Sequence, residues 1–199
     1  REIKVEDIKP YKNNPRHNKA LAETDDDGDL YFLVDDKDEQ VPDYIERYGE
    51  DRVKIFSKDE MAKRMAVADN FEGQKAIAYA RNAAYDVAEE LGLTYFLQLD
   101  DDYSSFLLRK LDGEGKLRAR KATEFNAIIK AMIEFLEVSR AKTVAFHQGG
   151  DMVGGKGSKP WKEGITRKAM NSFFCKTDRR IWFKGKLNED VTTYTLDGS

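Results

Sequence analysis

The sequence predicts an α/β fold, in which a sheet with parallel strands carries helices on both faces and antiparallel pieces enter in the second half. One observation leads to this class, and a second limits the size of the domain. Short apolar runs alternate with amphipathic stretches of helical period between residues 30 and 146, and such alternation is typical of parallel sheets covered by helices. A length of 199 residues allows one domain of ordinary size with an arm, and 36% charged residues indicate a polar surface.

The first elements predict a β-α-β unit. The apolar run Leu30–Val34 predicts a buried strand, and it ends at two aspartates. A short amphipathic helix is expected over Val41–Tyr48, followed by a second strand over Val53–Phe56. Ser57 then stands where a helix N-cap is needed, because its hydroxyl can accept a hydrogen bond from a free amide of the first turn.

The middle of the chain continues the alternation. Gln74–Leu91 has the clearest helical period, and a glycine follows its end. The strand Thr94–Leu99 comes next, and residues 112–115 predict a hairpin turn. An amphipathic helix over Thr123–Val138 and a buried strand over Thr143–Phe146 complete this part.

Two later segments are expected to be irregular or extended. Residues 149–164 hold six glycines and one proline, which predicts a mobile loop. Within it, residues 150–157 nearly match the phosphate-loop pattern, but Gly157 replaces the required hydroxyl residue, so no such loop is expected. We expect the tail from Thr166 onward to form strands.

Composition excludes several classes of protein. No apolar run approaches the roughly 20 residues that cross a bilayer, and the N-terminus has no apolar signal core, so a cytoplasmic protein without membrane contact is expected. Cys175 is the single cysteine and only His17 and His147 accompany it, too few ligands for a zinc cluster. Any metal must therefore bind to carboxylates. The first residue is arginine, from which we expect a trimmed or partial chain.

Charge is distributed unevenly along the chain. Residues 152–187 contain ten basic and two acidic residues, a net charge of +8, which leaves −11 for the remainder of a chain whose net charge is −3. Aromatic residues are interspersed with these cations, a mixture suited to a polyanion that carries bases. The alternative is a solvated basic face over a small aromatic core. The candidates for acceptor or DNA binding are Lys156, Lys159, Trp161, Arg167, Lys168, Arg179 and Arg180.

Three consecutive carboxylates follow the strand Thr94–Leu99. Asp100, Asp101 and Asp102 stand at its carboxyl end, where open α/β sheets bind ligands. Three carboxylates packed together repel one another unless they share a cation, and Mg²⁺ and Mn²⁺ prefer such oxygen ligands. An acidic turn without a ligand is the alternative interpretation.

The residues Ala80-Arg81-Asn82 opening a helix, followed by Leu99-Asp100-Asp101-Asp102, resemble the nucleotide-sugar half of GT-A glycosyltransferases. That resemblance implies a GT-A-like, Rossmann-type mixed sheet and a DxD motif, in which Asp100 and Asp102 hold Mn²⁺ or Mg²⁺ on the donor diphosphate. It further implies that Arg81, Asp100 and Asp101 contact the donor, and that Asp35 or Asp36 meets its base or ribose.

The downstream segments are similar to a narrower family. Residues 167–178 and 188–191 resemble the bacteriophage glycosyltransferases associated with TET-type dioxygenases. This resemblance implies glycosylation of 5-hydroxymethylcytosine in DNA, and a bacterial host cytoplasm as the location. Residues 1–29 are expected to be an arm whose opening resembles ParB-like proteins. Residues 30–199 would be one GT-A-type domain, with a nucleotide-sugar and metal half over 30–110 and an acceptor half over 111–199.

A second chemical centre is expected at Asn188-Glu189-Asp190. Transfer by direct displacement needs a carboxylate that removes the proton of the acceptor hydroxyl. Asp190 is the first candidate for this base and Glu189 the second, because many GT-A enzymes carry such a pair in their second half. A surface turn with two acids is the alternative.

The sequence thus leads to one functional hypothesis with three competitors. It predicts a metal-dependent glycosyltransferase that moves a sugar from a UDP-sugar, UDP-glucose or a relative, to the hydroxyl of 5-hydroxymethylcytosine in double-stranded DNA. The competitors are a glycosyltransferase with a saccharide or protein acceptor, a sugar-phosphate nucleotidyltransferase, and a non-catalytic, transferase-like DNA-binding module.

Overall fold

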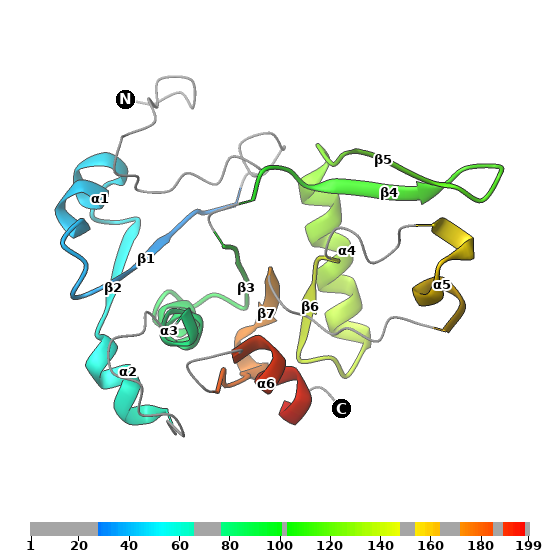
Figure 1. The fold of residues 1–199 in the computed structure, drawn as a ribbon. Helices are drawn as coiled ribbons and strands as arrows, with labels where there is room; N and C mark the ends of the chain where they lie inside the picture. The colour runs from blue at the N-terminus through cyan, green and yellow to red at the C-terminus, as the bar shows by residue number, and fades with distance from the viewer. Residues whose placement is uncertain are drawn as a thin grey trace.

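The structure is a computed structural model, and it describes residues 28–65, 77–100, 103–147, 154–163, 172–184 and 189–197. Helices and strands alternate through the first half and are mixed in the second (Figure 1). In chain order the elements are β1 (Phe32–Asp35), α1 (Val41–Tyr48), β2 (Val53–Phe56), α2 (Lys58–Arg64), α3 (Ile77–Glu90), β3 (Tyr95–Gln98), β4 (Leu107–Leu111), β5 (Leu117–Lys121), α4 (Phe125–Val138), β6 (Thr143–Ala145), η3 (Gly155–Gly157), α5 (Lys159–Glu163), β7 (Phe173–Lys176), η4 (Thr177–Arg179) and α6 (Glu189–Asp197).

The described strands form three small sheets. β1 pairs with β2 in parallel, β4 pairs with β5 as an antiparallel hairpin, and β7 lies between β3 and β6 and is antiparallel to both. β3 and β6 therefore run parallel to each other across β7. The predicted α/β class is confirmed, but the described strands do not join into the single mixed sheet of a GT-A fold.

Helices cover both faces of the β3–β7–β6 sheet, as predicted. Successive residues of a strand point to opposite faces. Phe173 and Cys175 of β7 accordingly pack in one core cluster with Tyr85 of α3. Phe174, which lies between them in the strand, packs in a second cluster with Met132 and Leu136 of α4. β7 is thus the central layer between α3 and α4.

The first part of the chain builds the predicted β-α-β unit. Phe32 of β1 stacks on Tyr48 at the end of α1, with ring centroids 3.8 Å apart. Ser57 is the N-cap of α2, and its side chain accepts a hydrogen bond from the amide of Glu60 at 3.5 Å. α3 contacts both β1 and β3, so it lies between the two sheets (Figure 1).

The predicted hairpin at residues 112–115 is confirmed. Asp112 forms its turn, because its Oδ1 accepts hydrogen bonds from the amides of Glu114, at 3.0 Å, and Lys116, at 2.8 Å. Asp112 also accepts a hydrogen bond from the Arg118 side chain at 2.8 Å, which ties the turn to β5.

Two expectations for the second half are wrong. Among the described residues beyond Thr166 only Phe173–Lys176 is a strand, and Glu189–Asp197 is a helix. The acids at positions 189 and 190 lie in the first turn of that helix, where the helix dipole stabilises negative charge. This stabilisation opposes the preference of the following Val and Thr residues for strands. Of the expected glycine-rich loop, residues 155–157 form a 3-10 turn and residues 159–163 a short helix.

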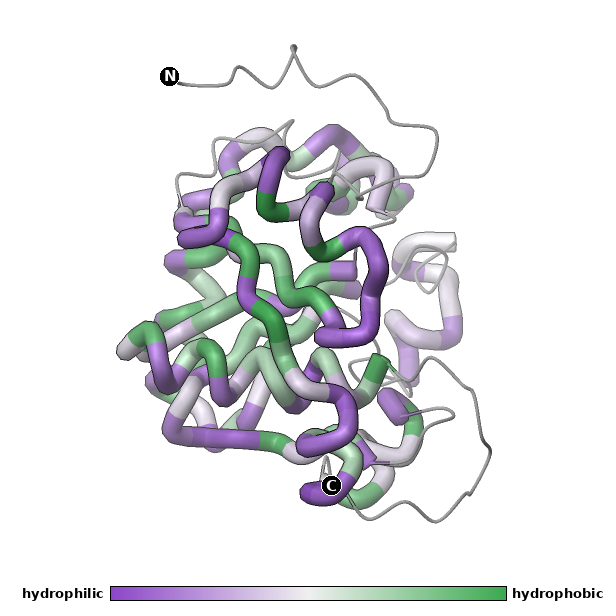
Figure 2. Tube along the Cα trace, turned by 90° about the vertical axis from the view of Figure 1, so that its left-hand side faces the viewer, coloured by the Kyte–Doolittle hydropathy of each residue, from purple (hydrophilic) through white to green (hydrophobic). Residues whose placement is uncertain are grey.

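Hydrophobic residues gather along the strands in the middle of the molecule, and hydrophilic residues occupy the turns around them (Figure 2). The largest side chains that are fully buried include Tyr85, Phe125, Phe183 and Leu136, which come from α3, α4 and the chain after β7. Within the described ranges, every helix is too short or too polar to cross a bilayer.

Candidate functional site

Arg81 on α3 is a buried cation with two carboxylate partners. Its side chain is 8% exposed, its Nη1 donates to Glu189 Oε1 at 2.8 Å, and its Nη2 lies 3.5 Å from Asp100 Oδ1. The guanidinium carbon also lies over the rings of Phe173 and Phe183, at 4.9 and 5.4 Å from their centroids. One arginine thus joins α3, the end of β3 and the start of α6. We call Arg81, Asp100 and Glu189 the Arg81 cluster.

Neighbouring backbone contacts fix the position of this arginine. The side chain of Gln98, the last residue of β3, donates to the Arg81 carbonyl at 3.2 Å. The side chain of Asn82 exchanges two hydrogen bonds with the backbone of Phe183, each 2.9 Å long. The amide of Lys184 then donates to Thr193 of α6 at 3.4 Å. Through these bonds the chain after β7, and with it α6, is held against α3.

A chain of hydroxyl groups reaches Asp100 from its other side. Tyr103 Oη donates to Asp100 Oδ2 at 3.4 Å, and Ser172 Oγ donates to Tyr103 Oη at 2.9 Å. Burial raises the pKa of Tyr103 to about 12, so this phenol keeps its proton at neutral pH. Ser172 is buried and has a φ of 52°, a left-handed conformation that is unusual for a residue other than glycine.

Sequence reasoning missed these two residues. Tyr103 directly follows the aspartate run, and its position alone could have drawn attention to it. Ser172 lies within the segment 167–178 that carries the family resemblance, but nothing in the sequence predicts its contact with Tyr103, because a positive φ at serine results from the surrounding fold.

The two acids at the start of α6 differ in their surroundings. Glu189 is buried, and this burial raises its pKa above the ordinary value, although the charge of Arg81 acts in the opposite direction. Asp190 is partly exposed, and its Oδ1 accepts a hydrogen bond from the amide of Val191 at 2.7 Å. Only Glu189 is therefore held in the Arg81 cluster, and Asp190 is the more exposed of the two acids.

The predicted metal ligands are described only in part. Asp101 and Asp102 lie outside the described residues. Elsewhere in the described ranges, no group of three or more Asp, Glu, His or Cys side chains could hold a metal ion. Asp100 itself fits as one ligand, because its side chain is 29% exposed and its contact with Arg81 is the longer of the two. A hard carboxylate oxygen is the ligand type that Mg²⁺ and Mn²⁺ prefer.

Asp35 and Asp36 stand at the end of β1 and lie next to α2. Asp35 pairs with Lys58 Nζ at 2.7 Å, and Asp36 accepts a hydrogen bond from the Lys58 amide at 3.2 Å. Burial would raise the pKa of Asp35, but the hydrogen bonds from Lys58 and the Lys37 amide outweigh it, so this pKa is lowered. These contacts of both aspartates tie β1 to α2, and neither contact reaches the Arg81 cluster.

Arg179 and Arg180 make contacts within the fold. Arg179 Nη1 donates to three carbonyls at or just beyond the end of α4, those of Leu136, Ser139 and Ala141, at 2.6, 3.2 and 3.1 Å. Arg180 bonds Asp86 at 2.6 Å and lies over the Trp182 ring at 4.2 Å. These contacts tie both arginines to other parts of the fold, and their role in acceptor binding stays a prediction.

Of the other candidates, Lys156 lies in η3, and Lys159 and Trp161 lie in α5. The amide of Lys156 donates to the Gly115 carbonyl at 3.4 Å, which joins η3 to the hairpin turn. Lys159 pairs with Glu163 at 3.7 Å, and Trp161 is 46% exposed. Arg167 and Lys168 lie outside the described residues.

Comparison with known proteins identifies the family. A family model described as TET-Associated Glycosyltransferase matches residues 13–198. No curated protein and no solved structure matches the chain. The matched range includes all members of the Arg81 cluster and extends over almost the whole chain. The chain belongs to the TET-associated glycosyltransferases, and it is a glycosyltransferase.

Proposed function

We propose that the protein transfers a sugar from a UDP-sugar to the hydroxyl of 5-hydroxymethylcytosine in double-stranded DNA, and that the reaction depends on a divalent metal ion. The observation that carries this proposal is the Arg81 cluster. It unites the end of β3, where the aspartate run begins, with the acidic pair at the start of α6. The two centres predicted from sequence are thus neighbours, as a donor site and a general base must be.

The donor side of the site consists of the aspartate run. Asp100 and Asp102 would hold Mn²⁺ or Mg²⁺, and Asp101 would contact the donor. A divalent ion, when bound there, neutralises charge on the leaving diphosphate. Arg81 would keep its short bond to Glu189 and give up the longer contact with Asp100. Its charge would then lie near the donor phosphates, where a buried guanidinium can stabilise a developing negative charge.

The acceptor side begins at α6. Asp190 would take the proton of the hydroxymethyl group while the hydroxyl oxygen forms a bond to the anomeric carbon and the bond from that carbon to the diphosphate oxygen breaks. Asp190 suits this role better than Glu189, because it is partly exposed whereas Glu189 is buried against Arg81. Glu189 holds the arginine in place and is a positioning residue.

The proposal is tested by incubating the protein with UDP-glucose, Mn²⁺ and duplex DNA that contains or lacks 5-hydroxymethylcytosine, followed by mass analysis of the nucleosides. We expect a gain of one hexose on the modified nucleoside only. Replacing Asp190 by asparagine should slow transfer by about 10²-fold or more. Asp100→Asn should abolish the response to Mn²⁺, and Asp43→Asn, at an exposed position on α1, is the matched control.

Two results would contradict the proposal. One is the absence of transfer from any UDP-sugar to hydroxymethylated DNA in the presence of metal. The other is an Asp100→Asn variant whose rate and metal dependence equal those of the Asp43→Asn control.

A further inference from the structure

We propose that the β4–β5 hairpin, together with η3 and α5, is the surface that binds the phosphates of duplex DNA. This inference deepens the proposed function, in which DNA is the acceptor. The sequence of the hairpin, LLRKLDGEGKLRARK, contains six basic and two acidic residues, and it lies outside the basic segment that the charge pattern first indicated. In Figure 1 the hairpin extends past α4, with α5 below it.

The register of the hairpin gathers its cations on one face. Residues that pair across an antiparallel ladder point to the same side. Lys110 pairs with Arg118, and Leu108 pairs with Arg120. All four side chains are exposed. Three of the four residues on this exposed face are therefore basic, and only Leu108 is apolar.

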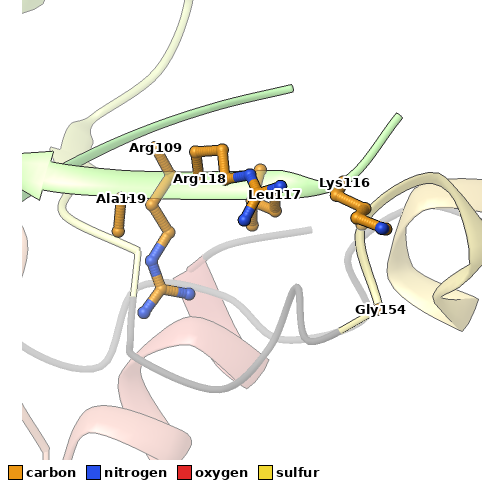
Figure 3. A pocket seen from close by; sticks show the side chains of 7 residues that line it. Arg109, Lys116, Leu117, Arg118, Ala119 and Gly154 are labelled. Atoms are coloured by element: carbon orange, nitrogen blue, oxygen red, sulfur yellow. The ribbon is translucent and has the colours of Figure 1, made fainter. Parts of the chain in front are cut away.

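A basic groove lies between the hairpin and η3. This groove has a volume of about 470 Å³, and its lining residues are Arg109, Lys116, Leu117, Arg118, Ala119, Gly154 and Gly155. Figure 3 shows the side chains of Arg109 and Lys116 extending from the hairpin beside it. Gly155 allows the close approach, because a Cβ there would lie 2.7 Å from the Gly115 carbonyl oxygen.

Two basic segments that are distant in sequence thus meet at one place. Lys156 follows directly after the groove glycines, and its side chain lies along Gly115. Lys159 and Lys162 follow on α5 and are exposed. Trp161 stands between them at 46% exposure and offers a flat ring beside the cations.

These cations are available to a polyanion. Within the described residues, neither Arg109 nor Lys110 forms an ion pair. Arg118, Arg120 and Lys116 pair with Asp112, Glu124 and Glu114 at 2.8, 3.0 and 2.9 Å, and the basic partner is more than half exposed in each pair. Exposed pairs of this kind contribute at most about 1 kcal/mol, so a phosphate can replace the carboxylate at little cost.

Shape and charge favour duplex DNA as the partner. A two-stranded antiparallel ribbon fits the major groove of B-DNA, and the cations on its rims can reach the phosphates. The chain as a whole has a net charge of −3, so attraction to a polyanion must come from a local surface such as this one. An acidic protein is the other polyanion that such a surface could meet, and the experiment separates the two.

The experiment compares two double variants that each remove two positive charges. Arg109→Gln with Lys110→Gln changes the hairpin, and Arg52→Gln with Lys63→Gln, at exposed positions directly before β2 and on α2, is the matched control. Binding to a fluorescent duplex is measured by anisotropy across a salt series, without any sugar donor. A thermal unfolding curve of each variant reports on folding, and Lys156→Gln with Lys159→Gln provides a second hairpin-side variant.

We expect the hairpin variant to bind the duplex at least about tenfold more weakly at low salt, with a log–log salt slope smaller by about 1.8, since each lost phosphate contact removes about 0.9. The control should match the wild type. Equal affinities for the hairpin and control variants would overturn the proposal. So would a hairpin variant that binds DNA normally but no longer binds polyglutamate, because the partner would then be an acidic protein. Sugar transfer by the wild type tests the proposed function separately, so the two can fail independently.

Discussion

Replacing Arg81 by methionine should destabilise the protein strongly, because it removes the only cation that the structure places against the buried Glu189 carboxylate among the described residues. The side chains of Arg81 and Glu189 are 8% and 12% exposed, and their bond is 2.8 Å long. Removal of one partner from a buried ion pair costs about 3–5 kcal/mol, since the remaining charge is left in a medium that solvates it poorly. Methionine keeps most of the apolar length that packs on Phe173 and Phe183.

The loss should depend on pH in a defined direction. Burial already raises the pKa of Glu189, and without the charge of Arg81 it should rise further. A carboxyl whose pKa is higher in the folded state stabilises that state below its unfolded value, and the stabilisation disappears as pH increases through the folded value. The variant should therefore lose more stability relative to the wild type at about pH 8 than at about pH 5, where the proton relieves part of the buried charge.

Urea unfolding, followed by tryptophan fluorescence at both pH values, measures this effect. The double variant Arg81→Met with Glu189→Gln should recover a large part of the loss, because the amide needs no counter-charge. Arg52→Met, the same substitution at an exposed arginine, should change stability by less than about 0.5 kcal/mol. A loss below about 1 kcal/mol for Arg81→Met at pH 8, or a loss that is larger at pH 5, would refute the reasoning.

Three further predictions concern other parts of the fold. Arg179→Met should lower the free energy of unfolding by about 1.5–3 kcal/mol, because three carbonyls at or just beyond the end of α4 lose a charged donor. Chemical denaturation measures this loss, and Arg140→Met, at an exposed position, is the control. Gly155→Ala should lower the Tm by the equivalent of about 1–2 kcal/mol or more, because its φ is +54° and the added Cβ would meet backbone atoms. Gly113→Ala is the control and should leave the Tm unchanged, because the space around Gly113 is open. Equal Tm values for the two variants would contradict the prediction. At pH 8, Cys175 should react with a thiol reagent far more slowly in the folded protein than in the protein unfolded by urea, because burial raises its pKa to about 11. Similar rates for the folded and unfolded protein would contradict the prediction and show that the thiol is accessible.

The sequence predicted most local elements, because local elements depend on local patterns. The helical period of Gln74–Leu91 and the apolar run before Asp100 placed α3 and β3 within a few residues of their bounds. The tail was misjudged, because Val191 and the threonines after it favour strands, whereas the two acids before them suit the first turn of a helix. The contacts of this helix with Arg81 and Lys184 belong to the tertiary structure.

The individual members of the candidate site were also accessible from sequence. Arg81, Asp100 and Glu189 were each named, from a helix motif, an aspartate run and an acidic pair. Arg179 and Arg180 were named as well, but as residues that face a polyanion. Charge alone cannot distinguish a cation that meets solvent from one that binds helix carbonyls or an internal aspartate, so their place in the fold became visible only in three dimensions.

What the amino-acid sequence by itself determined is the α/β class, the order of most elements and the residue types that carry the chemistry, because periodicity, turn residues and charge runs act over short distances along the chain. What only the tertiary structure decided is the set of partners: the bond from Arg81 to an acid 108 residues away, the left-handed serine behind Tyr103, and the basic ribbon that faces η3. The physical reason is that burial and Coulomb energy depend on distance in space, and that distance is fixed only when the sheets and helices have packed.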